Sequence, residues 1–385
     1  MKQTMVAIDR VEAVIIDVPT IRPHVLAMAT MRVQTALLVI VTRSDGVQGV
    51  GEANTISGLT YGDESPQSMK VNIDAYLGPL LIGADADNIN GAMARLDGAA
   101  VGNRFAKCAL ETALYDASAR AMGAPISSLF GGRRREALSM AWVLASGDTA
   151  KDIDEGQQML DTKRHRIFKL KIGLKSVAED CAHVAAIAEA LGRGAEIRVD
   201  VNQHWTRRQA QDGCARLQDV GVTLVEQPLK GSDHVGARAL MERFDLAIMA
   251  DEALSGPLSA YDLARTASAD VFALKIAQSG GLRAAKEVAA IAEVADIALY
   301  GGTMLEGPVG SLASAQLFAT LPALEWDTEL FAPLLLTENV AQEALVYEDY
   351  ELKLPTGPGL GVAMDWDKID ALAQDGQPKI TRVGA

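Results

Sequence analysis

From residue 138 onward, short apolar runs alternate with longer stretches in which apolar residues recur every three or four positions. The stretches at 178–191 and 282–295, for example, have the apolar spacing of amphipathic helices. Runs such as Phe272-Ala273-Leu274 are apolar throughout, as strands covered on both faces require. The pattern predicts a modified TIM barrel of the (β/α)7β type, with strands at 138–145, 168–172, 196–201, 223–226, 247–251, 271–276, 297–301 and 323–329.

The first part of the chain lacks this repeat. Strands are expected at 11–19, 36–42 and 47–53, followed by helices at 68–81, 89–97 and 104–122. Strands followed by helices predict a separate α+β capping domain. We therefore expect three parts: an α+β cap at 1–134, the α/β barrel at 135–334, and a C-terminal segment at 335–385 that returns to the cap.

Composition narrows the class of protein. The 385-residue chain is 49% hydrophobic and contains no apolar run long enough to cross a membrane, and its start lacks the pattern of a secretory signal. Three widely spaced cysteines (Cys108, Cys181 and Cys214) indicate reduced thiols in a cytoplasmic protein. The net charge of −14 disfavours nucleic-acid binding. An anionic ligand would therefore need a local cluster of cations.

Five charged residues stand at the ends of successive apolar runs: Lys171, Asp200, Glu226, Asp251 and Lys275. The intervals between them are 29, 26, 25 and 24 residues, about one strand, one helix and two loops each time. Because the carboxyl ends of barrel strands converge on one site, the spacing predicts a single pocket that contains all five.

Asp200, Glu226 and Asp251 offer three hard oxygen ligands, a set that suits one Mg²⁺ or Mn²⁺ ion. The alternative is that each acid caps the helix that follows it. Three acids in a row at barrel spacing favour the metal site.

Lys169 and Lys171 lie two residues apart on a strand and therefore share a face. Two amines in a barrel interior require acids or an anionic ligand nearby. Their proximity to each other and to a metal ion is expected to depress at least one of their pKa values toward neutrality. A solvated pair on an edge strand is the alternative. Lys275, three strands further on, would approach from the opposite side as a proton-handling group or a salt-bridge partner of a metal ligand.

Other candidates carry weaker signals. Glu329 ends the eighth predicted strand and could handle a proton or cap a helix. Thr303 follows Gly301-Gly302, where backbone could approach a ligand or simply turn. His24 and Arg22 are candidates for a loop over the pocket.

With these residues in place, the chain resembles the enolase superfamily, and within it the muconate-lactonizing branch, over nearly its whole length. The barrel motifs are Lys169-Leu-Lys171, Asp200-Val-Asn202, Val-Glu226-Gln-Pro, Asp251-Glu and Leu-Lys275-Ile. Gly-Gly-Thr303-Met-Leu-Glu-Gly, Thr-Glu329-Leu-Phe331, Pro19-Thr-Ile-Arg-Pro-His24 and Gly58-Leu-Thr-Tyr61-Gly point to that branch. Gly301–Thr303 stands where mandelate-racemase-like relatives carry a histidine base.

The resemblance implies reversible cycloisomerisation of cis,cis-muconate, a dicarboxylate, to muconolactone through an enediolate intermediate, in catechol degradation by the β-ketoadipate route. It implies Lys171 as the acid/base, supported by Lys169, Lys275 and Glu329, and one Mn²⁺ or Mg²⁺ ion per subunit of a homo-oligomer, often an octamer. Substrate-binding residues would be Ile56, Tyr61, Asn202, Thr303, Phe331 and His24.

Three other activities stay open: those of a chloromuconate cycloisomerase, a dipeptide epimerase and an o-succinylbenzoate synthase. Asp327-Thr328-Glu329 departs from the Asp-x-Asp of the epimerases, and the bulky Ile56 and Phe331 favour the non-halogenated substrate. A metal-stabilised barrel that binds without catalysis is the alternative from another class.

Overall fold

Seven parallel strands form the barrel sheet of the computed structural model, which describes residues 5–374. The strands follow one another in chain order around the sheet, as a (β/α) repeat requires. Their bounds are β5 (Ala141–Leu144), β6 (Ile167–Lys171), β7 (Glu196–Asp200), β8 (Leu224–Glu226), β9 (Ala247–Ala250), β10 (Val271–Leu274) and β11 (Ala298–Gly301).

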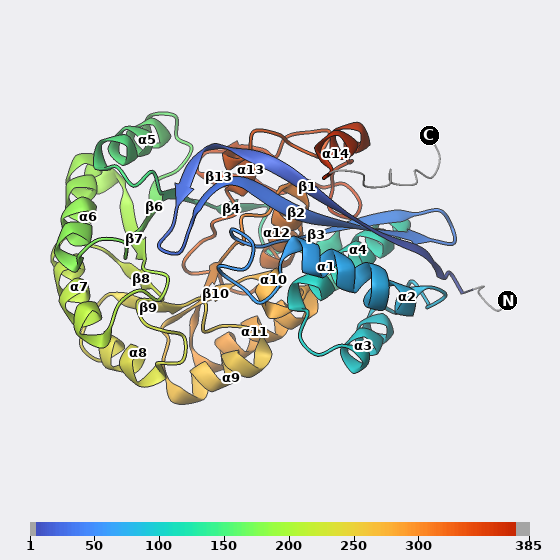
Figure 1. Ribbon diagram of the computed structural model, residues 1–385, viewed down its shortest axis with the longest axis horizontal. Helices are drawn as coiled ribbons and strands as arrows, with labels where there is room; N and C mark the ends of the chain where they lie inside the picture. Colours follow the sequence, from blue (N-terminus) through green and yellow to red (C-terminus); the bar gives the residue numbers. More distant parts are fainter. Residues whose placement is uncertain (1–4, 375–385) are drawn as a thin grey trace.

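Helices cover the outside of this sheet, and α5 to α9 form an arc along one edge in Figure 1. Several begin at a polar side chain that accepts a backbone N–H: Ser176 and Thr206 form capping boxes before α6 and α7. The helices are α5 (Thr149–Asp161), α6 (Val177–Leu191), α7 (Arg207–Asp219), α8 (His234–Met241), α9 (Pro257–Thr266), α10 (Ile276–Ser279), α11 (Leu282–Ala295), α12 (Pro308–Phe318) and α13 (Ala332–Leu335). The helices predicted at 178–191 and 282–295 are confirmed.

The eighth predicted strand, 323–329, does not form. Thr328 alone bridges β11 at Gly301 on one side and Met140 on the other. Asp327 adopts a left-handed backbone conformation, with φ of 61°, and this interrupts the extended chain. The barrel therefore closes through single bridges at Thr328 between its first and seventh strands.

The first predicted strand, 138–145, is split into β4 (Ala137–Ser139) and β5. β4 leaves the barrel sheet because it pairs antiparallel with β13 (Glu351–Lys353) of the tail, which in turn pairs with β12 (Tyr347–Glu348). The described tail also contacts the cap: the backbone N–H groups of Thr337 and Gln374 donate to Pro19 and Ile15 of β1. The last helix among the described residues of the tail is α14 (Trp366–Leu372).

The cap contains an antiparallel sheet of β1 (Ile8–Val25), β2 (Thr30–Arg43) and β3 (Gln48–Asn54). The three predicted strands are confirmed, and β1 and β2 are longer than expected. Helices α3 (Ile89–Ala99) and α4 (Arg104–Ala121) match the predictions. The helix predicted at 68–81 consists of α1 (Pro66–Asn72), a π-helical turn (Ile73–Leu77) and α2 (Gly78–Leu81).

The cap sheet packs closely on α4 because β3 presents glycines to it. A Cβ atom on Gly51 would lie 1.9 Å from the carbonyl oxygen of Ala109, so only glycine fits there. The long β1 and β2 run from this sheet toward the barrel (Figure 1). Val25 donates its N–H to the carbonyl of Ala145, which fixes the end of β1 at the mouth of the barrel.

We propose that the chain divides into three parts: residues 1–134, 135–334 and 335–385. Residues 1–4 and 375–385 of these ranges lie outside the described residues.

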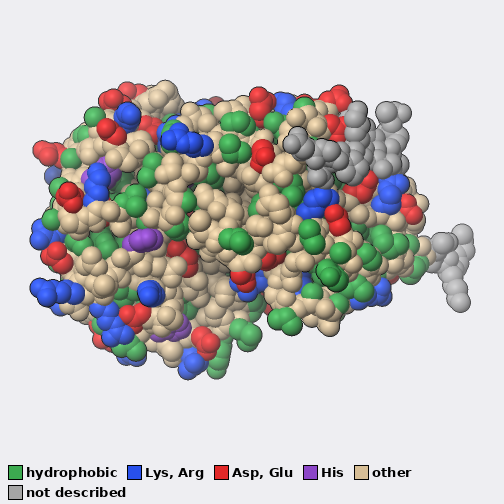
Figure 2. Space-filling view, viewed as in Figure 1, with side chains coloured by type: hydrophobic (Ala, Val, Ile, Leu, Met, Phe, Trp, Pro, Cys, Tyr) green, Lys and Arg blue, Asp and Glu red, His purple; other side chains and the backbone are tan. Residues whose placement is uncertain are grey.

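Figure 2 shows Lys and Arg side chains interspersed with Asp and Glu over one face of the molecule. Across residues 5–374, no helix is both long and apolar enough to cross a bilayer.

The cap is also joined to the barrel by a buried acid. Glu111 of α4 accepts the backbone N–H of Arg283 at the start of α11, at 3.2 Å, and its side chain is 1% exposed. Burial raises the pKa of Glu111 from 4.5 to about 7. The folded protein therefore binds this proton more tightly than the unfolded chain does.

This pKa shift predicts how stability depends on pH. As the pH rises from about 4.5 to about 7, the free energy of unfolding should fall, because ionising the buried carboxyl costs more than ionising it in the unfolded chain. Glu111→Gln removes this term, so the wild type should lose up to about 3 kcal/mol relative to the variant between about pH 5 and about pH 8. Urea titrations of both proteins across this range measure it. A difference that does not change with pH would contradict the prediction.

Candidate active site at the carboxyl ends of the barrel strands

The predicted acids meet because neighbouring strands pair in register. Asp200 of β7 pairs with Glu226 of β8, and Asp251 directly follows β9. Ligand oxygens of the three carboxylates all lie within 4.8 Å of one another, and all three side chains are buried. Three hard oxygen donors in this arrangement suit a divalent cation. The protein therefore contains a compact acidic triad fit for such an ion.

Each predicted lysine lies against one or two of the buried acids. Lys171 pairs in register with Asp200, and its Nζ lies 2.5 Å from that carboxylate. Lys169 Nζ lies 2.6 Å from Glu226 and 2.5 Å from Glu329. Neither lysine is a solvated surface residue, since their side chains are 1% and 10% exposed.

Lys275 directly follows β10, the strand that pairs with β9, and lies against the triad at Asp251. Its Nζ lies 2.7 Å from Asp251 and donates to the hydroxyl of Tyr61 at 2.8 Å. Tyr61 in turn donates to Asp251 at 2.6 Å. The cap thus reaches a predicted metal ligand through Tyr61, and the predicted salt bridge of Lys275 is present.

The neighbouring acids raise the pKa values of two of these lysines, Lys169 and Lys275. Burial by itself lowers the pKa of Lys169, but Glu226 and Glu329 outweigh burial and raise it well above its usual value. In the same way Asp251 outweighs burial and raises the pKa of Lys275. A depressed pKa is expected from the sequence for at least one of Lys169 and Lys171, and Lys169 is not that residue, because two acids lie against its amine. Burial and the neighbouring Asp200 raise the pKa of Glu226 well above its usual range.

A small cavity opens onto these groups. Its wall includes five of the six predicted substrate-binding residues, namely His24, Ile56, Tyr61, Thr303 and Phe331. It also includes Lys169, Lys171, Lys275, Glu226, Asp251 and Glu329. Charged groups and bulky apolar groups therefore face the same small space.

Asn202 is the exception among the predicted residues, since it does not line this cavity. Its backbone N–H and its Nδ2 donate to the two oxygens of Asp200 at 2.8 and 3.2 Å, and its Nδ2 also reaches Glu252 at 3.2 Å. The structure places Asn202 behind a predicted metal ligand, where it orients the carboxylate.

His24 is not in a loop, as the sequence suggested, but near the end of β1. It is 1% exposed because β1 extends over the barrel mouth. Burial, with the nearby charges of Lys171, Arg22 and Lys169, lowers its pKa well below the usual value, so its ring is neutral at pH 7. Arg22 points to Glu155 of α5 at 2.8 Å and secures this part of β1.

Sequence reasoning missed four residues of the site. Leu26, Val143 and Leu305 complete the cavity wall, and the ring of Tyr300 lies 5.2 Å below the Lys169 amine. None of the three aliphatic residues differs in pattern from an ordinary core residue. Tyr300 belongs to β11 and has no distinguishing sequence pattern. Its contact with Lys169 of β6 becomes visible only in the folded barrel.

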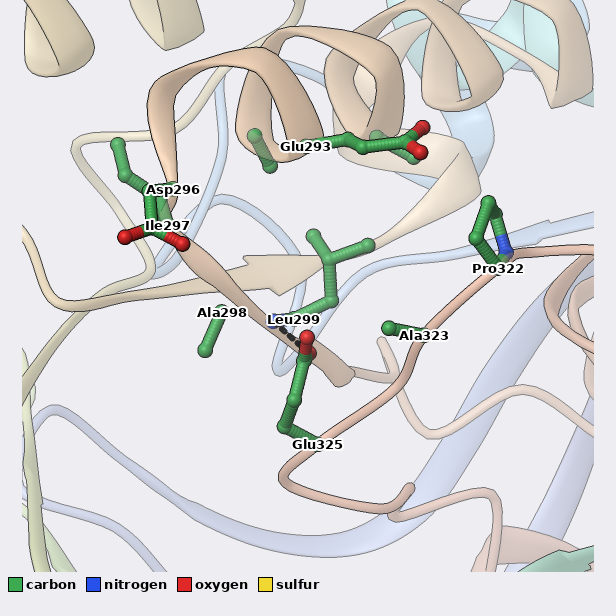
Figure 3. Close-up of a pocket in the computed structure, with 10 residues that line it drawn as sticks. Glu293, Asp296, Ile297, Ala298, Leu299, Pro322, Ala323 and Glu325 are labelled. Carbon is green, nitrogen blue, oxygen red and sulfur yellow. Dashed lines mark hydrogen bonds between the residues drawn. The ribbon is translucent and has the colours of Figure 1, made fainter.

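A second cleft, of about 390 Å³, lies at the amino end of β11. Figure 3 shows Glu293, Asp296 and Glu325 around it, with Glu325 accepting the N–H of Leu299 at 2.9 Å. Its three acids would repel a dianion. The cavity among the lysines is therefore the better site for an anionic substrate.

Two family models match the chain. Residues 10–131 match the N-terminal domain of the mandelate racemase / muconate lactonizing enzyme family, and residues 151–368 match the enolase C-terminal domain-like family. A muconate cycloisomerase (1-2) from Acinetobacter lwoffii is 56% identical, over 100% of this chain and 99% of that protein. The chain belongs to the muconate-lactonizing branch of the enolase superfamily. The resemblance drawn from the motifs is thus confirmed.

Solved structures agree with this placement in the muconate-lactonizing branch. The crystal structure of muconate lactonizing enzyme from Pseudomonas fluorescens complexed with muconolactone has a TM-score of 0.95, at 53% identity, over 96% of this chain and 100% of that chain. A chloromuconate cycloisomerase from Cupriavidus necator is 44% identical over 94% of this chain and 98% of that protein. The enolase-type fold predicted from the sequence is confirmed.

The acidic triad predicts the effect of one substitution on metal binding. Asp251→Asn should weaken Mn²⁺ binding by at least about tenfold, since a neutral amide replaces one of three anionic ligands. Calorimetric titration with Mn²⁺ measures this. Asp327→Asn is the matched control: Asp327 pairs with Arg198 at 3.3 Å and lies outside the triad, so its affinity should equal that of the wild type. Unchanged Mn²⁺ affinity in Asp251→Asn would remove this residue from the ligand set.

Proposed function

We propose that the protein is a muconate cycloisomerase that interconverts cis,cis-muconate and muconolactone. The observation that carries this proposal is the small cavity in which three lysines, Glu329 and two acids of the triad, Glu226 and Asp251, face a bulky apolar wall. The Acinetobacter lwoffii relative, which is 56% identical, bears this name. A non-catalytic barrel would have no need to bury so many charges in one place.

We propose Asp200, Glu226 and Asp251 as the ligands of one Mg²⁺ or Mn²⁺ ion. When bound, such an ion supplies positive charge that stabilises an enolate-like substrate carboxylate. The three carboxylates are held for this task by Lys171, Lys169 and Lys275 and by the amide of Asn202.

The lysines carry out the proton chemistry in this proposal. One carboxylate of the dianion adds to the conjugated double bond, forming a C–O bond and moving an electron pair toward the other carboxylate. Lys171 then donates its proton to the α-carbon, so that a dianion and one proton give a monoanionic lactone. In the reverse direction neutral Lys171 removes that proton.

Lys169, Lys275 and Glu329 have supporting roles. Lys169 lies next to Lys171 on the same strand face and holds Glu329, which we propose as a second proton-handling group. Lys275 faces the cavity from beside Asp251 and stabilises the charge that develops on the substrate. We propose that Ile56, Tyr61, Thr303, Phe331 and His24 bind the substrate and that Asn202 orients Asp200.

The remaining properties are also proposals. The bulk of Ile56 and Phe331, both buried in the cavity wall, favours unsubstituted muconate over chloromuconate. We propose a homo-oligomer, an octamer by analogy with the family, and a cytoplasmic location. The three described cysteines are buried and unpaired, as expected in a reducing compartment.

The proposed activity is tested by mixing the protein with Mn²⁺ and cis,cis-muconate. The ultraviolet absorbance of the conjugated diene should fall with time, and it should fall more slowly with chloromuconates. An unchanged absorbance would contradict the proposal and would favour a binding protein.

The role of Lys171 is tested by Lys171→Ala. Turnover should drop by about 10³-fold, because the proton donor is lost, while Mn²⁺ still binds. Lys151→Ala, which removes an exposed lysine on α5, is the matched control and should keep full activity. Retention of most activity in Lys171→Ala would exclude this lysine as the proton donor.

A further inference from the structure

One wall of the cavity comes from the loop between β11 and α12, residues 302–307. Thr303 and Leu305 of this loop line the cavity. Leu305 has a φ of 60°, a left-handed conformation that residues with side chains seldom adopt. A residue held in such a conformation at a ligand site needs support from its surroundings.

The support for this loop comes from the cap. Gln34 of β2 donates its Nε2 to the carbonyl oxygens of Met304 and Leu305, at 3.0 and 2.9 Å. Asn54 of β3 donates its Nδ2 to the same Leu305 carbonyl at 3.1 Å. The backbone on either side of the strained φ angle is therefore fixed by two side-chain amides of the cap.

A third cap residue holds the end of the loop. Glu52 of β3 accepts the N–H of Gly307 at 2.6 Å and that of Gly310 at 2.8 Å, at the first turn of α12. Glu52 and Asn54 are two residues apart on β3 and share a face of the sheet, while Gly51 faces α4 on the other side. Two side chains on the barrel-facing side of β3 thus hydrogen-bond to the loop and to the start of α12.

None of these three cap residues reaches the substrate cavity, yet all are buried, at 0–2% exposure. Within the loop, Leu305 donates its N–H to Thr303 Oγ1 at 2.9 Å, and Met304 donates to Glu306 at 2.8 Å. The Thr303 hydroxyl also donates to Glu306. The position of the Thr303 side chain is therefore tied to the backbone that the cap holds.

We propose that Gln34, Asn54 and Glu52 are positioning residues, which set the cavity wall at Thr303 and Leu305 and through it the affinity for the dicarboxylate substrate. This inference rests on the proposed function for its kinetic consequence. Its structural part, the dependence of the loop on the cap, does not.

Gln34→Met tests the proposal, because methionine keeps the length of the side chain and removes its donor. The value of kcat/KM for cis,cis-muconate should fall about tenfold, mainly through KM, with kcat within about threefold of the wild type. Backbone amides of the segment 303–310 should exchange with solvent about tenfold faster in the absence of substrate.

A double-mutant cycle tests whether Gln34 acts through the loop. Leu305→Gly relieves the left-handed strain, since glycine adopts this conformation freely. In that background Gln34→Met should lower kcat/KM by less than about threefold. An equal loss in both backgrounds would overturn the proposal.

Ser118→Ala is the matched control. Ser118 is also buried in the cap, and its hydroxyl donates to the Ala86 carbonyl at 3.1 Å, away from the loop. This variant should lower the melting temperature without changing KM or exchange at 303–310. If it raises KM as much as Gln34→Met does, the three residues serve only general stability and the proposal fails.

Asn54→Ala is a second variant, which serves if Gln34→Met does not fold. It should also raise KM and speed amide exchange at 303–310. Absence of muconate turnover in the wild type would count against the proposed function alone. Unchanged exchange at 303–310 in both cap variants would overturn the positioning role, whatever the substrate.

Discussion

The structure depends on the pairing of buried charges in one cavity. A buried ion is costly unless an opposite charge and hydrogen bonds surround it, and here each lysine lies within 2.7 Å of a carboxylate. Four acids and three amines leave one negative charge. A divalent cation would turn this into one positive charge, which would attract a dianionic substrate. The buried groups alone would repel a dianion, so the charge of the site favours an anionic substrate only together with a cation.

The cap is held to the barrel by the same kind of interaction. Glu52 accepts N–H groups at the start of α12, and Glu111 does so at the start of α11. Helix N-termini carry partial positive charge, so a buried acid of one unit finds its partner at a fixed place on the other. These contacts set where the cap strands lie, and hence where Tyr61 and His24 meet the lysines.

Much of the active site could be predicted from the sequence, because parallel strands recur at regular spacing and their carboxyl ends lie at the same end of the barrel. Asp200 and Glu226 lie next to each other for that reason. The rest depends on contacts between segments distant in the chain, which leave no periodic pattern. The burial of His24 requires β1 to extend over the barrel, and the left-handed Leu305 requires amides from β2 and β3. The direction of the Lys169 pKa shift required knowing that two acids touch one amine.

Discrimination between plain and chlorinated muconate falls on the apolar wall, because chlorine leaves both carboxylates in place for the charged groups to bind. Phe331 packs edge-on against Trp142, with ring centres 5.0 Å apart. Trp142 donates its Nε1 to Glu155 at 2.8 Å, and Glu155 is the partner of Arg22 on β1. The docking of β1 thus supports the wall from behind. A difference of one substituent in such a pocket changes the binding free energy by about 1–3 kcal/mol. Because the cap supports the apolar wall, small shifts of the cap can alter substrate preference while the lysines and carboxylates stay in place.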